Sequence, residues 1–241
     1  MSAITTDAVH VASKPSTQTS THARFEKSLP TLLSVIAGMV DLTGLVNFHL
    51  FTAHITGNLV MVSALLVRGS HVSKAQFLAI PVFVVAVAAT WLIAKASGWH
   101  GPRLLRLLLV AQFLLIACVL IVSVITKPST NPNAFMGTIA AMIAVSAMAC
   151  QFALLRLTMP VAPTTAVMTG NLTTTFLFLF DASAHSQVLM MRDTEKLRGT
   201  AHLLIGFLVG CLLSAGAIAF LGHEWAWAVP VVASAMAMIL S

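Results

Sequence analysis

The stretch HITGNLVMV at residues 54–62 has a counterpart in VMTGNLTTT at residues 167–175, and both lie in apolar surroundings. Each holds a threonine, a glycine and an asparagine, which are poorer helix formers than the leucine and alanine around them. Why an apolar segment should carry this triplet twice depends on the kind of chain that contains it.

The chain has the composition of a membrane protein. Of its 241 residues 58% are hydrophobic and only 8% are charged, and the mean hydropathy is +0.95. A soluble domain of this length needs more charge to cover its surface. The net charge of +6 is spread over short loops, without a basic stripe and interleaved aromatic residues. This distribution indicates contact with membrane lipid and excludes nucleic acid as a partner.

Eight apolar runs follow a polar amino-terminal segment. Residues 1–28 are rich in serine and threonine and predict a disordered cytoplasmic tail, whereas residues 29–241 predict a transmembrane domain. Crossing a bilayer takes about 20 helical residues. The two runs that contain the TGN triplets are doubtful spans. The runs cover 29–48, 51–67, 76–94, 104–126, 134–155, 163–180, 200–221 and 226–240.

The two triplets belong to a longer internal repeat, with halves at about 29–126 and 134–241. Six full spans plus two short TGN-containing helices would make the halves inverted, as in many secondary transporters. Eight spans, the alternative, would make them parallel. In both models the distribution of basic residues places both termini in the cytoplasm. We therefore predict an all-α polytopic membrane protein and favour six spans.

Each triplet is a candidate polar site. Threonine and asparagine are good helix N-caps, so each TGN predicts a short helix that begins inside the membrane and directs its free amides at a pocket. A close helix–helix contact at the glycine is the alternative. The candidate residues are Thr56, Gly57 and Asn58 in the first half and Thr169, Gly170 and Asn171 in the second.

Asp41 is the one acidic residue in the middle of an apolar run. A carboxylate at this depth is costly and normally faces a partner or a cavity. It can be a protonated structural donor, a proton- or cation-linked carboxylate, or the partner of a cation. Gln151, the counterpart of Asp41 in the second half, is a further candidate site residue, and Arg156, five residues on, is the expected cation. His49 and His54 flank the first TGN and are candidate proton relays.

Four stretches resemble the YoaK-like family of bacterial polytopic membrane proteins, a family classed as a domain of unknown function. The resemblance extends over 29–241 and implies a polytopic inner-membrane protein without an assigned substrate. The stretches are AGMVDLTGL at 37–45, HLFTAHITGNLVMVSALLVRG at 49–69, AMACQFALLRL at 147–157 and PTTAVMTGNLTTTF at 163–176.

The expected function is that of a small secondary transporter or permease in the bacterial inner membrane, with a polar site for a small molecule or ion at the TGN motifs and Asp41. A non-transporting sensor, scaffold or assembly factor is the alternative. The sequence contains no nucleophile, nucleotide-binding or metal-ligating motif, so we expect no enzyme activity, catalytic residue, cofactor or metal. A homo-oligomer is compatible with all of these expectations.

Overall fold

The computed structural model of the chain describes residues 17–69, 72–131, 134–160, 170, 172–173, 175–176 and 192–240, and the regular elements in these ranges are all helical. The α-helices are α1 (Thr17–Phe48), α2 (Ile55–Val67), α3 (Lys74–Ser97), α4 (Pro102–Thr126), α5 (Phe135–Thr158), α7 (Arg192–Leu221) and α8 (Ala228–Leu240). Two 3₁₀ turns, η1 (Pro128–Thr130) and η2 (Trp225–Trp227), complete the elements.

The chain is a helical membrane protein. Five helical segments are long and apolar enough to cross a bilayer, while the helices Ile55–Val67 and Trp225–Leu240 are shorter. The five long segments are Ser28–Phe48, Lys74–Ser97, Pro102–Thr126, Phe135–Thr158 and Arg198–Leu221. The prediction of an all-helical chain with several apolar spans agrees with these elements, whereas the number of spans and the two repeat halves stay predictions. The predicted short helix at the first TGN is observed as α2.

The amino-terminal boundary differs from the prediction. A disordered tail was expected to reach residue 28, but α1 begins at Thr17, so residues 17–28 form its first turns. Residues 1–16, the rest of the expected tail, lie outside the described residues. Hydropathy marks only the apolar part of a helix, and a polar extension of the same helix leaves no such signal.

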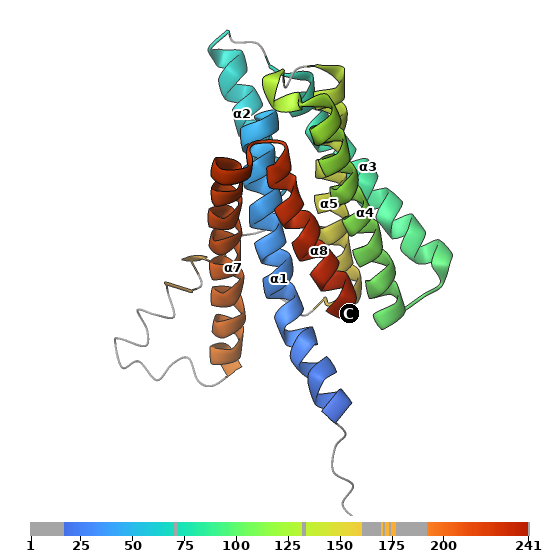
Figure 1. Ribbon diagram of the computed structural model, residues 1–241. Helices are drawn as coiled ribbons and strands as arrows, with labels where there is room; N and C mark the ends of the chain where they lie inside the picture. The colour runs from blue at the N-terminus through green and yellow to red at the C-terminus, as the bar shows by residue number, and fades with distance from the viewer. Residues whose placement is uncertain are drawn as a thin grey trace, which may run out of the picture.

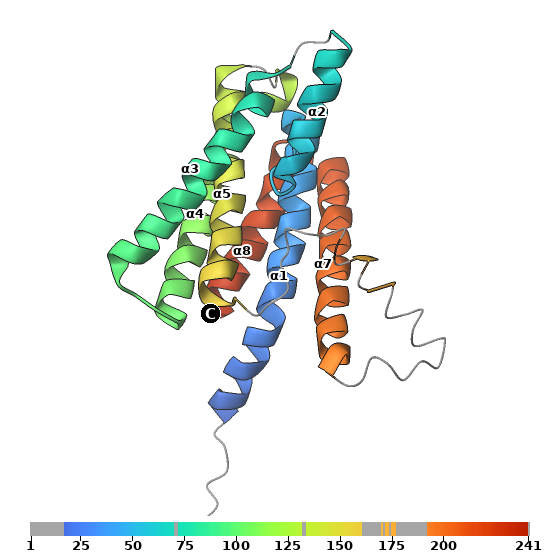
Figure 2. The same ribbon diagram turned by 180° about the vertical axis from the view of Figure 1, so that it is seen from behind.

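The long helices alternate in direction. In Figure 1, α1, α4 and α7 run upward, whereas α3, α5 and α8 run downward, so the start of α1 and the carboxyl terminus lie at the same end. The chain reverses after α1, and α2 begins beside α1, partway along its length, before rising toward the upper end (Figure 2). The short helix α2 and the start of α3 therefore lie at the same end of the bundle as the end of α1.

Helices α1 and α5 form the centre of the bundle. Within their most apolar windows 67% of α1 and 61% of α5 are buried, against 11% of α3. Helix α1 packs along α7, and α5 packs along both α3 and α4, while α8 covers α1 and α4. Gln151 on α5 connects three helices: its side chain accepts a hydrogen bond from Gln112 Nε2 on α4 (2.7 Å) and donates one to the Leu33 carbonyl on α1 (2.9 Å).

Helices α1 and α7 approach closely enough for backbone contact. A Cβ added to Gly210 would lie 2.1 Å from the Val35 carbonyl oxygen, and one added to Gly38 would lie 2.2 Å from that of Phe207. The spacing of Gly206 and Gly210 is the small-residue pattern that lets membrane helices approach. Ser34 Oγ also donates to the Leu203 carbonyl at 2.6 Å. This contact fixes α7 against the part of α1 that carries Asp41.

Candidate functional site

Asp41 lies on α1 about two turns before the helix ends at Phe48, and only 4% of the residue is exposed. Its Oδ1 accepts hydrogen bonds from the backbone amides of Thr52 and Ala53, both at 2.8 Å. These amides belong to the non-helical segment 49–54 that turns back along α1. Irregular backbone inside a membrane protein needs partners for its polar groups, and one carboxylate oxygen satisfies two of them.

The first TGN motif holds the same segment from the other side. Asn58 is fully buried, and its side chain pairs with the backbone of Phe51, accepting from the amide at 2.8 Å and donating to the carbonyl at 2.7 Å. A Cβ at Gly57 would lie 3.0 Å from the Phe51 ring. Asn58 and Asp41 therefore fix three consecutive residues, 51–53, between α1 and α2.

This arrangement corrects the predicted capping role of the motif. Helix α2 begins at Ile55 with His54 at its N-cap, and no side chain caps it. Thr56 is exposed in the first turn, and Asn58 reaches backward to the preceding segment instead of bonding the first amides of its own helix. The triplet was correctly expected at the start of a short helix, but its asparagine stabilises the re-entrant segment.

We expect Asn58→Leu to destabilise the folded protein by about 2–3 kcal/mol, because it leaves the Phe51 amide and carbonyl unpaired inside the protein. Thermal unfolding of the purified protein in detergent measures the effect. Thr56→Val is the matched control from the same triplet, and because Thr56 is exposed it should change stability by less than about 0.5 kcal/mol. Equal effects of the two variants would contradict the role given to Asn58.

His54 completes the coordination of Asp41. Its Nδ1 lies 2.6 Å from Asp41 Oδ2, and its side chain is 30% exposed, whereas that of Asp41 is 5% exposed. Because Oδ1 already accepts two amides, the contact at Oδ2 is the place where a proton is shared. With Asp41 ionised and His54 neutral, the pair holds one proton, on the imidazole, and carries a charge of −1. With a second proton the pair is neutral. The imidazole is the more exposed of the two groups, and its ring nitrogens can both carry a proton.

A cavity of about 370 Å³ opens beside this pair, between α1, α2 and α7. The ring centroids of His54 and Phe207 are 5.2 Å apart, and those of His54 and Phe51 are 6.4 Å apart, both in edge-to-face geometry. The cavity is lined by Asp41, Leu42, Leu45, Phe51, His54, Gly57, Phe207 and Cys211. It is an open recess with an apolar and aromatic lining, and its wall holds the Asp41–His54 pair and the Cys211 thiol.

Cys211 brings a thiol to the cavity from α7. Its Sγ lies 3.5 Å from the Gly38 carbonyl and donates to it. The thiol proton is therefore directed at backbone and away from the imidazole, so the three side chains Asp41, His54 and Cys211 do not form a nucleophile–base relay.

Other predicted site residues lie elsewhere, and the pairing of Asp41 with Arg156 is wrong. Gln151 bonds α1 at Leu33, eight residues before Asp41 and thus about 12 Å along the helix. Arg156 lies further along α5 in the direction away from Asp41, and it is exposed. The predicted cation is replaced by His54 and two backbone amides.

His49 takes a structural position. It ends α1 with a φ of 57°, is exposed, and accepts a hydrogen bond at its carbonyl from Gln76 Nε2 on α3 at 2.8 Å. Only His54 of the two relay candidates contacts Asp41. In the second half Gly170 is helical and exposed, while Thr169 and Asn171 lie outside the described residues. Their predicted part in a site stays a prediction.

Sequence reasoning missed the contribution of α7. Phe207 and Cys211 line the cavity, but nothing in their local pattern says which helix they face. The GxxxG spacing at Gly206 and Gly210 is a signal from which a close helix contact on this part of α7 could have been expected, but it was not used. The aromatic side of the cavity follows from that contact.

Comparison with known proteins gives one match. A family model described as "Protein of unknown function (DUF1275)" matches residues 29–240, which is nearly all of the chain after the amino-terminal segment. No match was found among curated proteins or among solved structures.

Proposed function

We propose that this chain, which belongs to the DUF1275 family of proteins of unknown function, is a small proton-coupled transporter for an organic cation. The observation that carries the proposal is the Asp41–His54 pair, joined at 2.6 Å in the wall of a cavity of about 370 Å³. An ionisable pair inside a membrane protein is expensive to keep and marks ion and proton pathways. The apolar and aromatic lining suits a solute with an apolar body.

The charge of the pair supplies the coupling. With one proton the pair is −1 and attracts a cation, and Phe51 and Phe207 bring aromatic rings to the same lining, where a cation can be stabilised by contact with a ring. With two protons the pair is neutral and the attraction is lost. A cation and a proton therefore compete for the same site, which is the requirement for exchange of one against the other.

The architecture supports a transporter with six spans and two short segments. Helix α2 begins beside Asp41, where His54 contacts it, and rises toward the end of the bundle at which α1 ends (Figure 2), so it fits a re-entrant segment. The turn η2 with α8 would supply the sixth span, at about 24 Å a short one. The packing of α1 on α7 has a counterpart in that of α5 on α3, and equivalent helices of the two halves run in opposite directions (Figure 1). Both features favour inverted repeats.

The distribution of charge supports the orientation. With six spans, ten of the 13 lysine and arginine residues fall on the side of the two termini. The excess of basic residues marks the cytoplasmic side of a bacterial inner membrane. We propose no enzyme activity: the Cys211 thiol donates to the Gly38 carbonyl, and among the described residues that line the cavity none is an activated nucleophile.

Proteoliposomes loaded with a pH-sensitive dye test the exchange. The outside solution receives a panel of quaternary ammonium ions with apolar substituents, which cannot carry protons across the bilayer as neutral bases, and protein-free liposomes give the background. We expect at least one of them to make the lumen more alkaline, as protons leave in exchange. Asp41→Asn should abolish this signal, because an amide cannot carry the charge that changes in the cycle.

Glu224→Gln serves as the control, since Glu224 bonds Ser129 outside the cavity. It should exchange cations like the unaltered protein. A panel without any proton movement would refute cation exchange, and so would a signal that survives Asp41→Asn.

The complete pairing of Asp41 Oδ1 favours a second candidate. Two amides already occupy this oxygen, so the carboxylate could serve only to hold the re-entrant segment. A sensor, scaffold or assembly factor of fixed structure would then be the function. It predicts a protein that binds a cation without moving protons, or binds none.

A further inference from the structure

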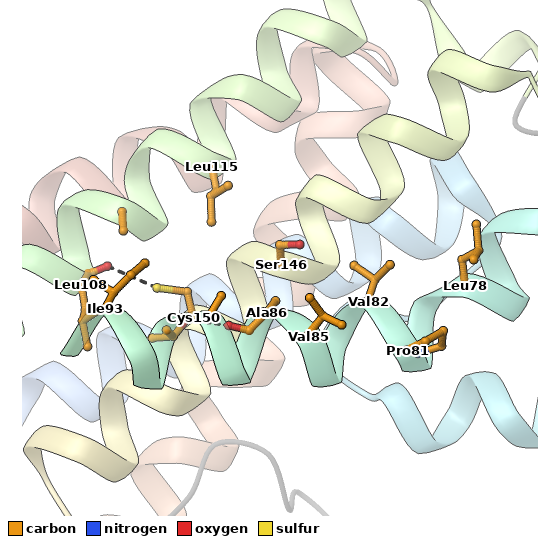
Figure 3. Close-up of a pocket in the computed structure, with 13 residues that line it drawn as sticks. Leu78, Pro81, Val82, Val85, Ala86, Ile93, Leu108, Leu115, Ser146 and Cys150 are labelled. Atoms are coloured by element: carbon orange, nitrogen blue, oxygen red, sulfur yellow. Dashed lines mark hydrogen bonds between the residues drawn. The ribbon is translucent and has the colours of Figure 1, made fainter. Parts of the chain in front are cut away.

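A second cavity, of about 470 Å³, lies on the other side of the bundle between α3 and α4. Both helices pack on α5, and they diverge from each other toward the turn that joins them at the lower end of Figure 1. Figure 3 shows the side chains of α3 along one wall, Leu108 and Leu115 of α4 along the other, and Ser146 and Cys150 of α5 behind them. We refer to this space as the α3–α4 groove.

Among the described residues that line the groove, the polar side chains are all bonded to backbone. Thr90 Oγ1 donates to the Ala86 carbonyl at 2.8 Å and Ser146 Oγ to that of Met142 at 2.8 Å. The thiol of Cys150 lies 3.6 Å from the Leu108 carbonyl and donates to it. Each polar side chain in the lining is thus satisfied by backbone, and what faces the space is hydrocarbon. An apolar ligand is the kind that such a lining accepts.

The shape of the groove is elongated. On α3 its lining extends from Leu78 to Ile93, which corresponds to about 22 Å along the helix. A space of this length and lining suits an extended hydrocarbon chain better than a compact solute.

The lower end of the groove is positively charged. Lys95, Arg103 and Arg106 are exposed around the turn between α3 and α4, and the segment 95–106 contains no aspartate or glutamate. Lys95 Nζ lies 5.0 Å from the centre of the exposed Trp91 ring, the arrangement of a basic and an aromatic side chain at a membrane surface. The groove therefore combines a hydrocarbon space with cations at its membrane-surface end.

We propose that the α3–α4 groove binds an anionic phospholipid, with one acyl chain between α3 and α4 and its headgroup at Lys95, Arg103 and Arg106. A second copy of the chain fits less well. In a two-fold dimer through this face, the three cations of both copies would lie at the same depth in the membrane and repel one another. The lipid supplies both the hydrocarbon and the opposite charge. This site is separate from the Asp41 cavity, so its test does not depend on transport.

Titration of the delipidated protein in detergent, followed by native mass spectrometry, measures lipid binding. We expect dioleoyl-phosphatidylglycerol to bind roughly tenfold or more tightly than dioleoyl-phosphatidylcholine, because each cation near a headgroup adds to the affinity. Replacing all three cations with glutamine should remove this preference. The control replaces Arg68, Lys74 and Lys127, at the opposite end of the bundle, and should keep it.

Two neighbouring alanines test the acyl chain. Ala88 and Ala89 are both exposed on α3, and only Ala89 lines the groove. Ala89→Trp should weaken phosphatidylglycerol binding about tenfold by filling the space, whereas Ala88→Trp should leave it unchanged. Equal binding of the two lipids by the unaltered protein would overturn the proposal. So would equal effects of the two tryptophans, or a dimer that Ala89→Trp alone dissociates.

Discussion

Asp41→Leu is expected to lower the free energy of unfolding by about 3–5 kcal/mol, because it strands the amides of Thr52 and Ala53 together with the imidazole of His54. The loss should appear as a lower midpoint of thermal unfolding in detergent and as reduced yield of monodisperse protein. Leucine keeps the branching of aspartate at Cγ and removes both of its acceptor oxygens.

Asp41→Asn is the matched control. Its carbonyl oxygen can accept the same two amides and its NH₂ can donate to His54 Nδ1, so we expect a loss below about 1.5 kcal/mol. An Asp41→Leu variant as stable as the unaltered protein would contradict the role of this carboxylate in holding residues 52–54. A large loss in Asp41→Asn as well would mean that the charge itself, rather than hydrogen bonding, stabilises the segment.

Gly210→Leu should destabilise the protein by about 3 kcal/mol or prevent its folding, since the contact of α1 with α7 leaves no space for a side chain. The added Cβ alone would lie 2.1 Å from the Val35 carbonyl oxygen, and backbone cannot move aside as a side chain can. Separating the helices would also break the bond from Ser34 to Leu203. Thermal unfolding in detergent again measures the change.

Gly216→Leu is the control on the same helix. A Cβ at Gly216 has nothing within 4 Å, so leucine there should change the free energy of unfolding by less than about 0.5 kcal/mol. If the two variants unfold alike, the close approach of α1 and α7 is not what stabilises this face of the bundle.

The sequence predicted the helices well because hydropathy reports burial in lipid directly. The apolar runs at 104–126 and 134–155 differ from α4 and α5 by at most three residues at either end. Hydropathy also separated the short run at the first TGN from the long spans. Hydropathy could not show that the residues of α1 before Ser28 are helical, because polar helical turns outside the membrane have no apolar signal.

The partners of Asp41 could not be derived in the same way. Arg156 was chosen on the assumption that equivalent positions of two halves meet, but Gln151 meets Leu33 rather than Asp41. Equivalent positions in two halves do not have to lie at equal depth in the membrane. On α1, Leu33 and Asp41 are about two helical turns apart. The true partner, His54, lies close in sequence, and only the reversal of the chain after Phe48 brings it back to Asp41.

The contribution of α7 to the cavity could not be predicted from the sequence, for a different reason. Periodicity places Phe207 and Cys211 on a helix, but which helix they contact depends on packing between segments far apart in sequence. The glycines at 206 and 210 limit the choice to a close neighbour without naming it. The capping role expected for Asn58 failed because a buried asparagine can bond backward to an irregular segment as well as forward to helical amides.

Modification of Cys211 tests most directly whether the cavity at Asp41 and His54 is open in turn to the two sides of the membrane. Cys118→Ser and Cys150→Ser leave Cys211 as the single thiol of the chain, and it lines the cavity. Right-side-out and inside-out vesicles are treated with the same membrane-impermeant methanethiosulfonate reagent. A transporter with this site predicts modification of Cys211 in both kinds of vesicle, slowed by a quaternary ammonium ion that occupies the cavity. Modification from one side only, or from neither, would contradict transport through this site.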